Sequence, residues 1–286
     1  MFTAILFSIT LLTNCIENPE ELSIYFEIAG RDTVDIGKFR GEICYRYYEE
    51  HKINFMLRIM KDTEVVFETG DHEIDLYNFS SDSTKAIYAN DIDGDGTLEF
   101  ILHCNSGGQQ CCNGFYVYSL YEKPVIRDSV VCYNPIGQLD DLDGDGIPEI
   151  FCGDDWFLGW KAHWSKSAGF RLIWKWDGER YRLANFKFAD YLLEQAMKWW
   201  KYDKIPTPEI LEGLHYDPDL DEPDFPPVQL WGRMLVYIYT GESNKADSLF
   251  DDYWPEEIPG KEEFYRDFRW HLERNGHWQQ LLESDW

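Results

Sequence analysis

Asp141-Leu142-Asp143-Gly144-Asp145-Gly146-Ile147-Pro148-Glu149-Ile150 is a short stretch with acidic side chains at alternate positions and glycines between them. Calcium takes several oxygen ligands at about 2.3–2.6 Å, and short Asp side chains on a tight loop can converge on one point. The stretch Asp91-Ile92-Asp93-Gly94-Asp95-Gly96-Thr97-Leu98-Glu99-Phe100 repeats the pattern earlier in the chain. Plain hairpin turns do not require the full ligand pattern twice, so we predict two calcium sites. The expected ligands are Asp91, Asp93, Asp95, Thr97 and Glu99 in one loop, and Asp141, Asp143, Asp145, Ile147 (through its carbonyl) and Glu149 in the other.

The loops differ from an EF-hand, which needs a bidentate Glu at loop position twelve and a helix on each side. That position holds Leu102 in the first loop and Cys152 in the second. Short apolar runs at 98–102 and 148–152 follow the loops and indicate buried strands. We therefore predict strand–loop–strand calcium sites.

The pattern Asp-x-Asp-x-Asp-Gly-x-x-(Asp/Glu) with apolar flanks resembles the FG-GAP/VCBS repeats of integrin-α-type β-propellers and many exported bacterial proteins. The resemblance covers residues 91–100 and 141–155, and it implies calcium binding by the acidic residues of both loops. Glu99 and Glu149 stand where the family usually has a final Asp. A closed propeller has about 4–8 blades, so two visible repeats favour a propeller-like β unit over a full propeller.

The first 15 residues, MFTAILFSITLLTNC, form an apolar run with the length of a signal-peptide core, too short to span a bilayer as a helix. Leu12-Thr13-Asn14-Cys15 resembles a bacterial lipobox, which implies lipidation of Cys15. The alternative is the buried first strand of a cytosolic protein. We favour export, to the periplasm or the cell surface, with membrane contact only through a lipid anchor.

The other cysteines are even in number, as expected for a disulfide-bonded protein in an oxidising compartment: Cys44, Cys104, Cys111, Cys112, Cys132 and Cys152. Six cysteines allow about fifteen pairings. We favour a bridge from Cys104 to Cys111 or Cys112. A zinc site that combines His103 with these thiols is the alternative, but a second paired cluster at zinc-finger spacing is missing.

The net charge of −27 argues against nucleic acid and anionic membrane surfaces as partners, because phosphates require a basic face. It is compatible with a soluble protein that binds cations.

The chain divides by periodicity into an antiparallel β domain at 16–185 and a helical region at 186–286, an α+β fold. A hairpin is expected around 61–63, and Asp177-Gly178 is typical of another hairpin turn. Helices are expected at 189–200, 228–239, 243–254, where Ser243 is the expected N-cap, and 261–274, with shorter ones after Pro208 and around Trp278. Tyr237, Ala246 and Phe250 have the spacing of a tetratricopeptide-like helical hairpin, for which an ordinary αα-hairpin is the alternative.

Asp154 and Asp155 are adjacent carboxylates among aromatic residues, which suggests acid–base chemistry. Neighbouring residues of a strand point to opposite faces, so the two cannot act on one substrate without a bend. An additional calcium ligand or an ordinary loop acid are the alternatives.

These patterns predict an exported, lipid-anchored protein in which calcium has a structural role and which acts as a binding or scaffold module for a protein or glycan. We name no catalytic residue. The alternative is an exported hydrolase or glycan-active protein, which would need two carboxyl groups at a defined separation. The chain contains neither a Gly-x-Ser-x-Gly nor a His-Glu-x-x-His motif.

Overall fold

The computed structural model describes residues 30–48, 51–70, 73–76, 89–105, 113–122, 124–132, 137–206, 225–255 and 258–284. The expected leader with Cys15, the short helix after Pro208, and Cys111 and Cys112 lie outside these residues. The chain forms two compact units, one of residues 1–148 with 177–181 and one of residues 149–176 with 182–286.

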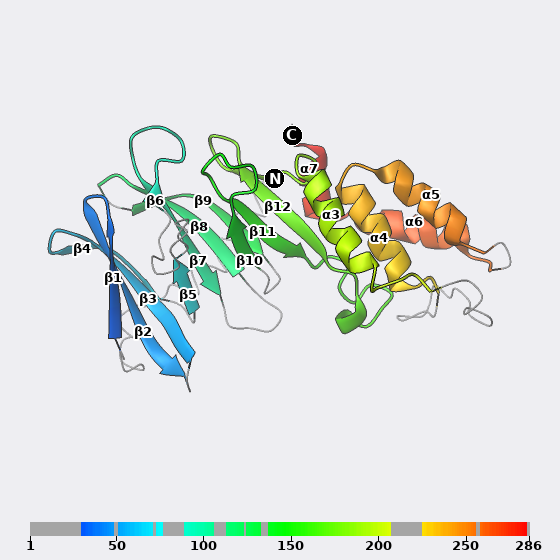
Figure 1. The fold of residues 1–286 in the computed structure, drawn as a ribbon, viewed down its shortest axis with the longest axis horizontal. Coiled ribbons are helices and arrows are strands. Elements are labelled where there is room, and N and C mark those ends of the chain that lie inside the picture. The colour runs from blue at the N-terminus through cyan, green and yellow to red at the C-terminus, as the bar shows by residue number, and fades with distance from the viewer. Residues whose placement is uncertain are drawn as a thin grey trace. The chain divides into compact units, whose positions relative to one another are not determined.

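The first unit contains two antiparallel sheets (Figure 1). One has the strand order β1 (Gly30–Ile36), β2 (Phe39–Tyr48), β3 (His51–Lys61), β4 (Glu64–Gly70). The other has the order β5 (Glu73–Leu76), β7 (Glu99–Asn105), β8 (Asn113–Leu120), β9 (Pro124–Cys132), and β6 (Ala89–Asn90) also pairs with β7. The expected hairpin around residues 61–63 is confirmed by β3 and β4, and Asp62 in their turn has a positive φ of 57°.

A hydrophobic core fills the first unit with side chains from both sheets. Leu57 and Ile59 of β3 pack in one cluster with Phe100 and Leu102 of β7, and all four are at most 1% exposed. Tyr118 of β8 stacks on Phe100 with ring centroids 5.0 Å apart. Each such side chain stabilises the fold by about 1.5–3 kcal/mol through burial, so this core gives the loop between β6 and β7 a rigid base.

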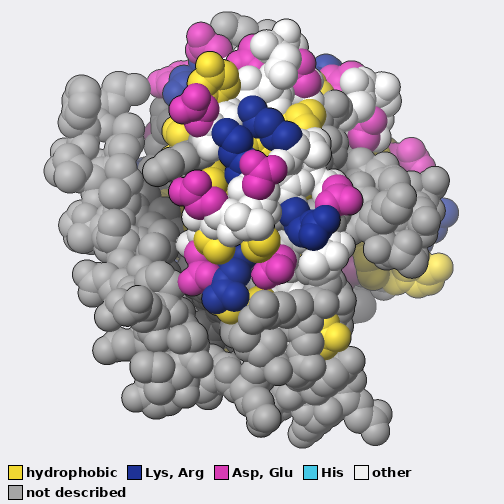
Figure 2. Space-filling model, turned by 90° about the vertical axis from the view of Figure 1, so that its left-hand side faces the viewer, with side chains coloured by type: hydrophobic (Ala, Val, Ile, Leu, Met, Phe, Trp, Pro, Cys, Tyr) yellow, Lys and Arg dark blue, Asp and Glu magenta, His cyan; other side chains and the backbone are white. Residues whose placement is uncertain are grey.

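Figure 2 shows the side of the first unit that carries β1–β4. Acidic and basic side chains alternate on this face, with a few hydrophobic side chains between them. Arg58 pairs with Glu68, and Arg40 with Asp35. The described part of this face therefore presents mixed charge rather than one strongly acidic patch.

The third sheet has the order β10 (Gly137–Asp140), β11 (Glu149–Asp154), β12 (Phe170–Trp176), β13 (Tyr181–Leu183). Strands β11 and β12 pair antiparallel with Phe151 opposite Ile173. The expected Asp177-Gly178 turn joins β12 to β13, and Gly178 has a φ of 106°, which residues with a Cβ rarely adopt. A single 3₁₀ turn, η1 (Trp164–Lys166), lies between β11 and β12.

The described helices all lie in the second unit. They are α3 (Ala189–Trp200), α4 (Val228–Tyr239), α5 (Ser243–Tyr253), α6 (Lys261–Leu272) and α7 (Gly276–Leu282). The expectation that Ser243 caps α5 is wrong: Glu242 holds the cap position, and its side chain makes no capping bond. The reason is that Gly241, at a φ of 80°, ends α4, and the Glu242 amide donates back to Tyr237 O at 2.7 Å. Asn275 is the N-cap of α7, and its Oδ1 accepts from His277 N.

Aromatic side chains form the centre of the second unit. Phe157, after β11, lies 5.8 Å from the Trp231 ring of α4 and 5.5 Å from the Phe268 ring of α6, measured between centroids. Trp231 and Phe268 are fully buried. Trp231 of α4 and Phe268 of α6 thus pack against Phe157, which follows a strand of the same unit.

The described residues form an α+β fold with three antiparallel sheets followed by helices. Among the described residues, the last strand ends at Leu183 and the first helix begins at Ala189. None of the helices in the described ranges is long and apolar enough to cross a membrane.

Cys132 and Cys152 are both disulfide-bonded. Cys104, from which we expected a bridge, is a thiol, as is Cys44, so the preferred pairing of Cys104 is corrected. The preference rested on the short loop between Cys104 and Cys111, whereas disulfide pairing depends on which Cβ atoms the folded strands bring together.

Candidate metal centre

The first acidic loop joins β6 to β7 as a strand–loop–strand unit, in which Asn90 pairs with Glu99. Gly94 and Gly96 have φ values of 75° and 84°, so the backbone adopts a conformation that side chains with a Cβ disfavour. Gly96 N donates to Asp91 Oδ2 at 2.9 Å. The glycines thus fold the loop around the first acidic residue.

Three carboxylates of this loop converge. One oxygen from each of Asp91, Asp93 and Glu99 lies within 4.8 Å of the others. Two oxygens that bind one calcium ion at about 2.3–2.6 Å can be at most about 5 Å apart. The spacing of this group therefore fits a single calcium ion.

Glu99 is the most informative member of the group because it is only 1% exposed. Its Oε2 accepts from Ile92 N at 3.1 Å, whereas Oε1 is buried with no hydrogen-bond partner among the described residues. Burial raises the pKa of Glu99, and the charges of Asp93 and Asp95 add to this, against the opposing effect of hydrogen bonds from Ile92 N and Ser119. A buried carboxylate oxygen without a donor is costly unless a cation neutralises it.

Arg127 of β9 reaches the rim of the first loop. Its Nη2 lies 2.7 Å from Asp93 Oδ2, and its side chain is 37% exposed. Such a partly exposed pair contributes about 0–1 kcal/mol. It compensates part of the acidic charge through Asp93, at the exposed side of the loop.

The second loop repeats the local geometry of the first. Gly144 and Gly146 have φ values of 73° and 85°, and Gly146 N donates to Asp141 Oδ2 at 3.0 Å. One oxygen from each of Asp141, Asp143 and Glu149 lies within 4.8 Å of the others. Here Asp143 is exposed, whereas Asp93 of the first loop is partly buried.

Glu149 differs from Glu99 in having a buried cation beside it. Lys175 Nζ of β12 lies 2.9 Å from Glu149 Oε1, and the two residues are 4% and 0% exposed. This ion pair was not expected from the sequence, because Lys175 is 26 positions away in the chain. Only the register of β11 against β12 places it there.

Asp95 and Asp145, which were also expected as ligands, are not among the converging carboxylates. Asp95 Oδ1 accepts from Thr97 N at 2.7 Å, and Asp145 Oδ1 accepts from Ile147 N at 2.8 Å. The backbone hydrogen bond from Thr97 lowers the pKa of Asp95. Each of these aspartates thus folds its own loop, and each group holds three of the four acids expected as ligands.

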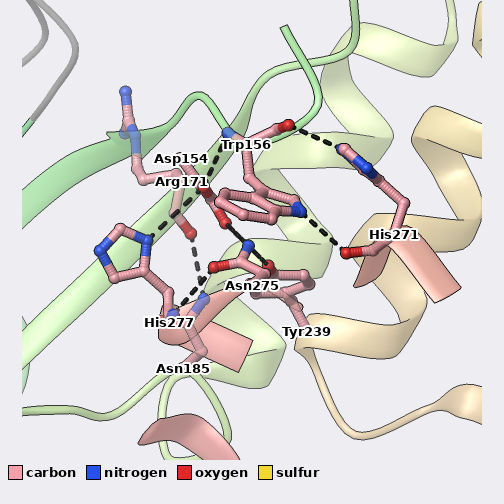
Figure 3. A network of polar contacts seen from close by, with 8 residues as sticks. All are labelled: Asp154, Trp156, Arg171, Asn185, Tyr239, His271, Asn275 and His277. Carbon is pink, nitrogen blue, oxygen red and sulfur yellow. Dashed lines mark hydrogen bonds and ion pairs between the residues drawn. The ribbon is translucent and has the colours of Figure 1, made fainter. Parts of the chain in front are cut away.

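Asp154, considered above for acid–base chemistry, lies at the end of β11 in a network of polar contacts (Figure 3). Its Oδ2 accepts from Tyr239 Oη and Asn275 Nδ2, both at 2.7 Å. Its Oδ1 accepts from Trp156 N at 3.1 Å and lies 3.6 Å from His277 Nδ1. Asp154 is 5% exposed, and the network ties β11 to α4 and to the N-cap of α7.

The pKa of Asp154 reflects this setting. Burial alone would raise it, but the contacts from His277, Tyr239 and Trp156 N outweigh burial and lower the pKa below its usual range. Asp155 shows the opposite direction, because burial and the neighbouring charge of Asp154 raise its pKa. The two neighbouring carboxylates thus lie in different environments, Asp154 enclosed in the network and Asp155 only partly buried.

The residues missed by sequence reasoning are Ser119, Arg127 and Lys175 near the acidic loops, and Tyr239, Asn275 and His277 around Asp154. Each lies in a different element from its carboxylate partner, so no local spacing could have indicated it. Comparisons with protein-family models, curated proteins and solved structures found no significant match to this chain.

Proposed function

We propose that this chain is an exported calcium-binding protein in which the ion crosslinks acidic loops of the β sheets. The observation that carries the proposal is Glu99, a buried carboxylate whose Oε1 has no donor among the described residues and which converges with Asp91 and Asp93. Calcium supplies two positive charges and accepts several oxygens in a flexible geometry. The residues present therefore suit calcium well.

In this proposal calcium has a structural role. Clustered carboxylates repel one another, and a bound ion turns that repulsion into a link between the loop and β7. Ligands that bind only the native state raise its stability according to their concentration. The resemblance to FG-GAP/VCBS repeats supports the same reading, with the β sheets presenting a surface for a protein or glycan partner.

Export is part of the proposal, with a lipid anchor at Cys15. The disulfide bonding of Cys132 and Cys152 supports it, because disulfides persist mainly in oxidising compartments such as the periplasm or the cell surface. Asp154, the strongest candidate for acid–base chemistry, already accepts hydrogen bonds from Tyr239, Asn275 and Trp156 N in a buried network. That arrangement favours a binding or scaffold module over a hydrolase.

The test is thermal unfolding of the full chain in calcium, in magnesium and in chelator. We expect the midpoint to rise with calcium concentration, by the equivalent of about 2.7 kcal/mol when free calcium is a hundred times its dissociation constant. Magnesium should act much more weakly, because it requires near-ideal octahedral geometry and releases its waters reluctantly. Identical midpoints in all three solutions would refute the proposed function.

A matched pair of variants locates the effect. Asp93→Ala should reduce the calcium-dependent rise, whereas Asp35→Ala, which removes the same charge from an exposed position of β1, should preserve it. An equal response of the two variants to calcium would show that the first loop is not the site.

A further inference from the structure

The two loops resemble each other in backbone, but their buried glutamates face different residues. Glu99 lies opposite Ser119 in the pairing of β7 with β8. In the pairing of β11 with β12, Ile150 lies opposite Trp174, which brings the preceding Glu149 to Lys175. The same position on the neighbouring strand thus holds a neutral hydroxyl in one case and an ammonium group in the other.

Ser119 cannot neutralise Glu99. It is 6% exposed, and its hydroxyl supplies at most a hydrogen bond to the carboxylate. When Glu99 is ionised, its negative charge lies in a buried position next to the partly buried Asp91 and Asp93. Full compensation at this site needs a cation from solution.

Lys175 does neutralise Glu149. The ammonium is buried at 2.9 Å from Oε1 and cannot move into solvent without leaving a buried anion behind. Separating such a pair is strongly unfavourable. A calcium ion that binds Glu149 must share the carboxylate with this positive charge, and like charges at short range repel each other.

Arg127 does not neutralise the first loop in the way that Lys175 neutralises the second. It pairs with Asp93 Oδ2 at the edge of the loop, and its side chain is 37% exposed. An exposed guanidinium can turn into water at little cost when calcium arrives, because exposed ion pairs contribute little. Arg127 is therefore a replaceable counter-ion, whereas Lys175 is a permanent one.

We propose that the two loops are functionally unequal: the Asp91–Glu99 loop is the calcium-responsive site, and in the Asp141–Glu149 loop Lys175 acts as a built-in cation that weakens calcium binding. This inference rests on the proposed function, because it assigns the calcium dependence to one of the two loops. The second loop then keeps its shape with or without calcium, and the first loop alone reports calcium concentration.

Isothermal titration calorimetry of the full chain with calcium chloride tests this inference. We expect one tight site, and a second site at least about tenfold weaker or beyond detection. Lys175→Met, which removes the charge and keeps a similar length, should strengthen the second site at least about tenfold. Lys166→Met is the matched control, because it makes the same charge change at an exposed position of η1 and should leave both sites unchanged.

Two further variants keep the test decisive if Lys175→Met fails to fold. Glu149→Gln combined with Lys175→Met removes the buried pair without creating a lone charge, and it should retain the tight site with a stoichiometry of one. Glu99→Gln, which keeps Lys175, should lose the tight site. Tight binding that survives Glu99→Gln but is lost in the paired variant would overturn the inference.

The outcomes separate the two proposals. If neither the parent protein nor any of the variants binds calcium, the proposed function is refuted. If the parent binds two calcium ions with equal affinity and Lys175→Met changes neither, the calcium function stands and the inequality of the loops is refuted.

Discussion

Replacing Asp154 with Ala is expected to lower the free energy of unfolding by about 3–5 kcal/mol, the range for removing one partner of a buried charged network. The loss leaves Tyr239 Oη, Asn275 Nδ2 and Trp156 N without the acceptor that they share in the native protein. Each buried donor left without an acceptor costs about 1–3 kcal/mol. Urea unfolding followed by tryptophan fluorescence measures the effect.

Asp155→Asn is the matched control for this prediction. Asp155 is the adjacent carboxylate, only partly buried, and its raised pKa shows that burial and Asp154 disfavour its charge. Removing that charge should leave stability unchanged or slightly higher. If Asp154→Ala unfolds at the same urea concentration as Asp155→Asn, the network does not hold β11 to the helices.

The same network predicts that the stability of the protein falls at low pH. The pKa of Asp154 is lower in the folded protein than in the unfolded chain, where an Asp has a pKa of about 3.9. Its contribution to stability is therefore complete above about pH 4–5 and is lost as the pH falls through the folded-state pKa. Between about pH 5 and pH 2, Asp154→Asn should lose less stability than the parent. If the free energy of unfolding falls equally with pH in the two proteins, Asp154 is not the source of the acid dependence.

The effect of Glu99→Gln on the free energy of unfolding is expected to change sign between chelator and calcium. In chelator the variant should be as stable as the parent or more stable, because it removes a buried charge next to Asp91 and Asp93 while an amide oxygen can still accept from Ile92 N. In calcium it should lose the ligand-linked stabilisation, about 2.7 kcal/mol at a hundred times the dissociation constant. Thermal unfolding of the variant and the parent in both solutions measures the two differences in stability.

Glu122→Gln makes the same charge change at an exposed turn position and should behave like the parent in both solutions. A Glu99→Gln variant that is destabilised equally in calcium and in chelator would show that Glu99 serves the apo fold alone. That result would also remove the main support for calcium at the first loop.

Features set by neighbours in the chain could be predicted from the sequence. The two loops follow from Asp and Gly at fixed spacing, and Gly94, Gly96, Gly144 and Gly146 all take the positive φ that such loops require. Helices α3 and α4 begin and end where the helical periodicity places them. The N-cap of α5 was predicted wrongly because Ser is a favoured N-cap residue, whereas the turn at Gly241 places Glu242 in that position without a capping side-chain bond.

By itself, the sequence determined the acidic loops, the order of strands before helices and the strongly negative net charge, because local spacing and composition carry that information. Only the tertiary structure decided that Lys175 pairs with Glu149 while Glu99 lies opposite Ser119, that Cys132 and Cys152 are disulfide-bonded, and that Asp154 is enclosed by α4 and α7. Asn275 and Asp154 are 121 positions apart in the chain. Strand register and helix packing bring such residues together, and these depend on burying the whole core rather than on any one segment.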